Sequence, residues 1–95
     1  MKAKRVFYDK QGLPDGAIIE MVIWQLPKAS AERQHGLKYS LFYGKDGKRL
    51  IGYDNERGKG DHRHYGDDEE SYVFETLEKL ISDFINDVNA LRGET

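Results

Sequence analysis

The chain contains no cysteine, only two prolines, and no apolar run that approaches the length of a membrane span. Without cysteine it has neither disulfide bonds nor zinc sites built from thiolates. The start of the chain is basic, but Val6-Phe7-Tyr8-Asp9 follows it instead of the apolar run of a signal peptide. These absences predict a cytoplasmic protein without membrane segments.

What the chain does contain predicts a single small domain over residues 1–95. Hydrophobic residues make up 38% and charged residues 34%, which is too apolar for a disordered segment. The net charge of −2 hides an asymmetry: residues 1–52 hold ten Lys and Arg against five Asp and Glu, and residues 53–95 hold five against twelve. The basic half can face a polyanion, although the acidic excess equally suits the solvated face of a helix and a loop.

Alternating apolar residues predict a sheet. A short strand over 5–8 precedes a Pro14-Asp15-Gly16 turn, and 17–26 forms a central strand with both faces largely apolar. Residues 37–54 read as a hairpin around an Asp-Gly turn, whose two-residue length sets Leu41 opposite Gly52.

The C-terminal part predicts a helix that begins after Thr76 and stops at Gly93. An apolar stripe with helical spacing follows the cap, formed by Leu77, Leu80, Ile81, Phe84, Ile85, Val88 and Leu91. The acids at 67–70 read as a solvated turn, and 72–74 as an optional further strand. The predicted fold is α+β: an antiparallel sheet of four to five strands with one C-terminal amphipathic helix packed on one face.

The stretch from Ile51 to Tyr65 is too polar to build a core and is the candidate functional segment. In a strand, His62 and His64 point to the same face. Two imidazoles in one cleft can divide the work of general base and general acid, as cleavage of RNA through its 2′-hydroxyl requires. Asp61 can orient an imidazole, and Arg57 can stabilise the charge on the phosphorane. We therefore predict His62, His64, Asp61 and Arg57 as catalytic residues.

The same stretch offers groups that bind a nucleic acid. Lys59 and Arg63 supply further cations, and Tyr53 and Tyr65 can stack on bases. Two other interpretations stay open. Asp61, His62 and His64 are also a possible metal-ligand set, which we rank below metal-free acid–base chemistry because it is a tight local chelate with no distant ligand. Alternatively, the histidines simply hydrogen-bond nearby acids in a solvated loop.

Several segments together resemble the TumE family, the toxins of a prokaryotic toxin–antitoxin pair. They are Leu13-Pro14-Asp15-Gly16, Met21-Val22-Ile23-Trp24, the run 39–44, Gly52-Tyr53-Asp54-Asn55-Glu56 and Gly60-Asp61-His62-Arg63-His64. The resemblance spans about Val6 to Leu91. It implies a small cytoplasmic toxin held by a cognate antitoxin that is a helix-turn-helix DNA-binding protein. Asp54, Asn55 and Glu56 are assigned to binding on this resemblance.

These observations predict a toxin that acts on RNA as a metal-independent endoribonuclease, with no cofactor. The alternative is a non-catalytic module whose polar segment recognises a nucleic acid or the antitoxin. An edge strand or the Trp24 face can pair with a second copy, so a homodimer is also an open outcome.

Overall fold

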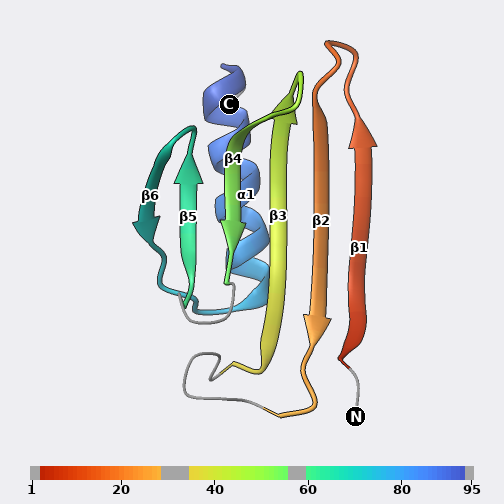
Figure 1. Cartoon of the computed structure of the whole chain (residues 1–95), viewed down its shortest axis with the longest axis vertical. Helices are drawn as coiled ribbons and strands as arrows, with labels where there is room; N and C mark the ends of the chain where they lie inside the picture. Colours follow the sequence, from red (N-terminus) through yellow and green to blue (C-terminus); the bar gives the residue numbers. More distant parts are fainter. Residues whose placement is uncertain (1–2, 29–34, 56–59, 94–95) are drawn as a thin grey trace.

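The computed structural model describes residues 3–28, 35–55 and 60–93, and in them six strands precede one helix (Figure 1). The strands are β1 (Lys4–Gly12), β2 (Ile18–Gln25), β3 (Leu37–Lys45), β4 (Lys48–Asp54), β5 (His62–Tyr65) and β6 (Asp68–Ser71), and the helix is α1 (Leu77–Arg92). Each strand pairs antiparallel with the next, so the order across the sheet follows the sequence. The α+β class and the C-terminal helix are confirmed, but the predicted number of strands was too low.

The acidic run forms a strand rather than the predicted solvated turn. Asp68–Ser71 pairs with β5 as the edge strand β6, after a turn in which Gly66 has φ 60°. All four side chains of β6 are exposed. A short, charged edge strand protects a sheet from pairing with other chains, and the same charge hides its strand character in the sequence. Residues 72–74, predicted as an optional strand, lie outside the sheet.

A bulge in the β3–β4 hairpin changes the register beyond the turn. The pairs next to the turn follow the two-residue Asp-Gly geometry, but Leu50 is then an extra residue in β4. Beyond it Phe42, and not Leu41, lies opposite Gly52, so the predicted pairing was wrong by one residue. One inserted residue moves the alternation that follows to the other face. The bulge therefore turns Gly52 and Asp54 away from the helix.

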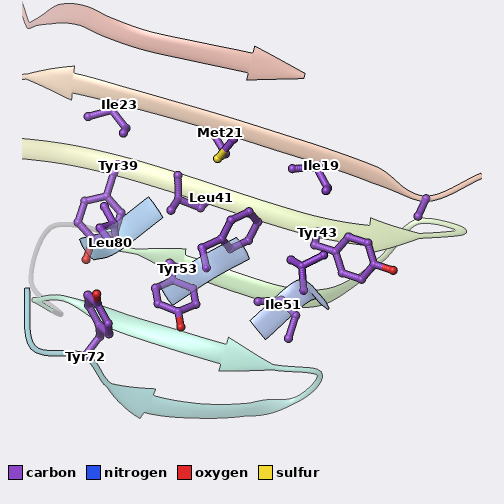
Figure 2. Packing of buried hydrophobic residues seen from close by; sticks show 13 residues of the cluster. Ile19, Met21, Ile23, Tyr39, Leu41, Tyr43, Ile51, Tyr53, Tyr72 and Leu80 are labelled. Atoms are coloured by element: carbon purple, nitrogen blue, oxygen red, sulfur yellow. The ribbon is translucent and has the colours of Figure 1, made fainter. Parts of the chain in front are cut away.

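The helix has the predicted ends and buries the centre of the predicted stripe, whereas Leu91 at the end of the stripe is exposed. Thr76 Oγ1 accepts a hydrogen bond of 3.0 Å from the backbone N–H of Lys79, and Gly93 closes the helix with φ 76°. Leu80, Phe84 and Val88 are buried. They belong to a core whose sheet side chains stand on one face (Figure 2): Ala17, Ile19, Met21, Ile23, Tyr39, Leu41, Tyr43, Ile51 and Tyr53.

The helix covers one face of the sheet and packs mainly on β4 (Figure 1). No other described element covers the opposite face. The side chains that β4 and β5 direct to that face are therefore not part of the hydrophobic core. Within the described residues, no helix combines the length and the apolar content needed to cross a membrane.

Candidate functional site

His62 and His64 share the sheet face opposite α1, together with a carboxylate from β4. In the β4–β5 ladder, His62 lies opposite Asp54, and His64 lies opposite Gly52. Because alternate residues of a strand point to the same face, both imidazoles and the Asp54 carboxylate gather there. The two histidines are only 5% and 7% exposed. The structure thus brings the two imidazoles together as their spacing predicts.

Both imidazoles direct a ring nitrogen at the same carboxylate. Nε2 of His62 lies 2.5 Å from Oδ1 of Asp54, and Nε2 of His64 lies 3.7 Å from Oδ2. The two ring centroids are 4.8 Å apart, with the planes at 79°. One ligand atom from each of the three residues lies within 4.8 Å of the others, which is a geometry that can hold a metal ion. We call Asp54, His62 and His64 the histidine cluster.

The backbone fixes the protonation pattern of the His62 ring. Nδ1 lies 3.0 Å from the carbonyl oxygen of Gly60, and a carbonyl only accepts, so Nδ1 carries the proton of that hydrogen bond. In the neutral imidazole, Nε2 is then the atom with the lone pair, and it faces Asp54. Although Oδ1 of Asp54 is close to Nε2, it is buried and accepts no hydrogen bond from any described residue.

Arg49 is the exposed member of this face. Its Nη1 lies 3.9 Å from Oδ2 of Asp54, and its side chain is 40% exposed. The stem of Arg49 crosses Gly52, where a Cβ atom would be 2.6 Å from the arginine Cδ. Burial lowers the pKa of His64, and the positive charge of Arg49 lowers it further. Arg49 therefore places a cation beside a histidine that favours its neutral form.

An open groove of about 550 Å³ adjoins the histidine cluster through Arg49. Lys48 and Arg49 line it with positive charge, and Phe42 contributes an aromatic side chain. Its other lining residues are Gly47, Leu50, Gly66 and Asp67. Two cations beside an aromatic ring suit a phosphate backbone and a stacked base.

Asp61, predicted to orient a catalytic imidazole, pairs with a different histidine. Its carboxylate lies 3.0 Å from Nε2 of His35, and Nδ1 of His35 accepts a hydrogen bond of 3.1 Å from the backbone N–H of Leu37. The His35 ring also packs on Phe74 with centroids 4.1 Å apart. Asp61 thus joins the start of β5 to the segment before β3, and Asp54 takes the position beside the paired histidines.

Three predicted binding residues face α1 rather than the histidine cluster. Tyr53 is fully buried in the core, and its hydroxyl donates to the carboxylate of Asp87. Tyr65 donates to the same carboxylate at 2.8 Å, and Arg63 Nη1 donates to the Tyr53 hydroxyl at 3.3 Å. Arg63 also pairs with Glu70. These side chains have structural partners, so they do not form a stacking surface beside His62 and His64.

The comparison with known families places the chain in a toxin family. Residues 3–92 match the model of the family described as Toxin TumE, which covers nearly the whole chain. The chain belongs to the TumE toxin family. No curated protein and no solved structure matches it.

The remaining residues of the TumE resemblance divide into two groups. Asn55 is buried: its Oδ1 accepts from the backbone N–H of Tyr39 at 3.0 Å, and its Nδ2 donates to the carbonyl of Leu37 at 2.8 Å. It fixes the end of β4 against β3, which is a structural role. Glu56, Arg57 and Lys59, also predicted as site residues, lie outside the described residues.

Arg49 is a candidate site residue of this TumE-family chain that the sequence did not single out. Simple alternation places Arg49 on the same face as Ile51 and Tyr53, which is the core side. The extra residue Leu50 moves Arg49 to the face of Gly52 and Asp54. The one signal available in the sequence is Gly52, whose lack of a side chain permits close approach of another group.

Proposed function

We propose that this TumE-family toxin is an endoribonuclease that cleaves RNA at the histidine cluster, with Arg49 as the phosphate-binding cation. The observation that carries the proposal is the convergence of two imidazoles and one carboxylate beside Arg49, next to a groove with two cations and an aromatic ring. The family supports the role of toxin and an antitoxin partner. We place its action in the cytoplasm, where RNA is available.

The chemistry follows from what these groups do to a phosphodiester. Cleavage needs a base, which removes the proton of the 2′-hydroxyl, and an acid, which protonates the leaving 5′-oxygen. The side chains of the histidine cluster supply the base. Arg49 neutralises the charge that builds up on the phosphate. The metal-free form predicted from the sequence needs, on each imidazole, one ring nitrogen that is free to exchange a proton with the RNA. The cluster favours this form less, because Nδ1 of His62 is bonded to Gly60 and its Nε2 faces Asp54.

A second candidate is the non-catalytic binding module, and the burial of the cluster favours it. His62 and His64 are less than 8% exposed, as expected of groups that stabilise a sheet. Under this proposal the groove with Lys48 and Arg49 holds a nucleic acid or the cognate antitoxin, expected to be a helix-turn-helix protein. Binding of RNA that weakens steeply with salt, without cleavage, is the result that selects this candidate.

The deciding experiment incubates purified toxin with a labelled single-stranded RNA and with a matched strand that carries 2′-deoxyriboses. Cleavage of the RNA alone, abolished by Asp54→Asn and by His64→Gln, supports the endoribonuclease. If the wild type leaves RNA intact yet arrests growth, or if both variants cleave as fast as the wild type, the proposal is wrong.

Expression in cells that lack the antitoxin provides the matching test of toxicity. Wild type is expected to arrest growth and degrade RNA, and Asp54→Asn is expected to do neither. Ser40→Ala is the control, since Ser40 is an exposed residue of β3 directly opposite Asp54 in the ladder and has no part in the cluster. The soluble amount of each variant is measured alongside, because loss of folding also removes toxicity.

A further inference from the structure

The contact between His62 and Asp54 brings two electron-rich atoms together. Nδ1 of His62 carries its proton toward Gly60, so Nε2 of the neutral ring presents a lone pair to a carboxylate oxygen 2.5 Å away. Two atoms this close need a cation between them, either a proton on Nε2, which makes the contact an ion pair, or a metal ion that both atoms ligate. The buried oxygen Oδ1 accepts no hydrogen bond from the described residues, and His64 directs a second ring nitrogen at the same carboxylate.

From this geometry we propose that Asp54, His62 and His64 bind a divalent transition metal ion of the zinc type. Two imidazole nitrogens and one carboxylate oxygen form a recurrent ligand set for such ions, whereas Mg²⁺ and Ca²⁺ prefer oxygen ligands. This set replaces the local chelate of Asp61, His62 and His64 considered from the sequence, since Asp61 is held by His35. The proposal adds a cofactor to the proposed function, and only the catalytic role of the ion rests on that function.

The hydrogen bond of His62 to Gly60 is the type of support that metal-bound histidines have. A ligating imidazole usually donates its second ring N–H to a carbonyl or carboxylate, which fixes the ring orientation and the tautomer. The Nδ1 bond to the Gly60 carbonyl, at 3.0 Å, does this and leaves Nε2 as the ligand atom. Gly60 itself has φ 71°, a conformation that favours glycine, and it precedes β5 by two residues.

The separations of the ligand atoms suit an ion after small side-chain rotations. Bond lengths of about 2.0–2.1 Å and tetrahedral angles place zinc ligands roughly 3.3 Å apart. The separations of 2.5 Å and 3.7 Å from Nε2 of His62 and of His64 to Asp54 lie on either side of that value, and all three ligand atoms lie within 4.8 Å of one another. The paired strands β4 and β5 carry all three residues.

Three protein ligands leave a coordination position open on the face that α1 does not cover. Catalytic zinc sites have this composition, with a water or substrate oxygen in the remaining position. Glu69, 44% exposed, has an oxygen 3.8 Å from Nε2 of His62, so among the described residues it offers a further carboxylate beside the cluster. When bound, such an ion supplies a Lewis acid beside the groove that Arg49 lines.

Isothermal titration of the tag-free, chelator-treated chain with ZnCl₂ tests the proposal. We expect saturable binding of a single zinc ion per chain and a rise in the melting temperature at a zinc excess of about tenfold. Asp54→Asn and His64→Gln are expected to weaken binding by at least ~10-fold and to remove the stabilisation. MgCl₂ in place of ZnCl₂ is expected to give neither signal.

His35→Gln is the matched control, because it removes a histidine nitrogen that is held by Asp61 and lies outside the cluster. It is expected to bind zinc like the wild type. Circular dichroism confirms that each variant folds. If Asp54→Asn does not fold, zinc binding by the His64→Gln variant alone decides the test.

Zinc binding that is absent in the wild type, or unchanged in a folded Asp54→Asn variant, overturns the metal site. The proposed function has a separate readout: RNA cleavage that persists in EDTA supports the endoribonuclease and overturns the catalytic role of the ion. Zinc bound by the wild type and lost in the variants, without RNA cleavage, supports the site and overturns the endoribonuclease.

Discussion

The side chain of Arg49 crosses the backbone of Gly52, so that a Cβ atom at position 52 would lie 2.6 Å from the arginine Cδ. Real Cβ contacts are not this short, and only glycine leaves the path open. The path carries the guanidinium to within 3.9 Å of Asp54 and to the wall of the groove. Gly52 thus positions the positive charge of Arg49.

We predict that Gly52→Ala displaces Arg49 and lowers RNA cleavage and toxicity to the level of Arg49→Ala. The free energy of unfolding is expected to change by less than about 0.5 kcal/mol, because the atom in the way belongs to a flexible side chain. Growth arrest in cells without antitoxin measures the first effect, and urea denaturation measures the second.

The control for this substitution is Gly12→Ala, in a strand position where an added Cβ meets nothing within 4 Å. It is expected to retain full toxicity. Should Gly52→Ala stay fully toxic while Arg49→Ala is inactive, the glycine does not position Arg49.

The position of Arg49 also shows where sequence patterns stop being informative. Alternation and caps predict the β2 strand and both ends of α1, because these depend on neighbours along the chain. The bulge at Leu50 depends on packing across the hairpin, and no local pattern indicates it. The extra residue leaves Arg49, which lies before it, opposite Gly44 and moves Asp54, which lies after it, to the same histidine face. The sequence therefore predicted the paired histidines but not the position of Arg49 beside them.

The sequence did not predict the partner of Asp61, for a related reason. The sequence assigned Asp61 to its neighbours His62 and His64, but in a strand and its approach adjacent side chains do not share a face. Its partner is His35, 26 residues earlier in the chain. Ion pairs over such separations follow from the sheet topology, and no pattern of neighbouring residues indicates them. The acids of β6 were predicted as a turn and form an edge strand. A run of charged residues is common in both, so the sequence does not distinguish them.

We predict that Asp61 and His35 stabilise the fold as a pair. Their side chains are 11% and 16% exposed, so their contact is only weakly screened by solvent. Asp61→Asn and His35→Gln are each expected to lower the free energy of unfolding, and the double variant by less than the sum, with a coupling of about 1 kcal/mol. A double-mutant cycle by urea denaturation measures this. RNA cleavage by folded Asp61→Asn is expected to stay near the wild-type level, and its complete loss restores the catalytic role predicted from the sequence.

We predict that Asp87 is a structural acceptor for the two tyrosines. Its carboxylate accepts from the Tyr53 and Tyr65 hydroxyls, and Tyr53 is fully buried. Asp87→Ala leaves a buried hydroxyl without its acceptor, so the free energy of unfolding is expected to fall by about 2 kcal/mol. The neighbouring exposed residue gives the control Asn86→Ala, with an expected change below about 0.5 kcal/mol. Equal stabilities of the two variants in chemical denaturation contradict this role.

We predict that Asp83 makes stability depend on pH in the acidic range. The hydroxyl of Tyr72 donates to it at 2.7 Å and Lys79 pairs with it at 2.9 Å, and together these contacts lower the pKa of Asp83. A carboxyl whose pKa is lower in the folded state stabilises the fold above its unfolded pKa of about 3.9, and that stabilisation is lost as the pH falls through the folded pKa. Asp83→Asn is therefore expected to be less stable than the wild type near pH 7 by about 1 kcal/mol. In urea titrations repeated down to about pH 2 the difference is expected to shrink, whereas a difference that stays constant over that range excludes the ionised carboxylate as its source.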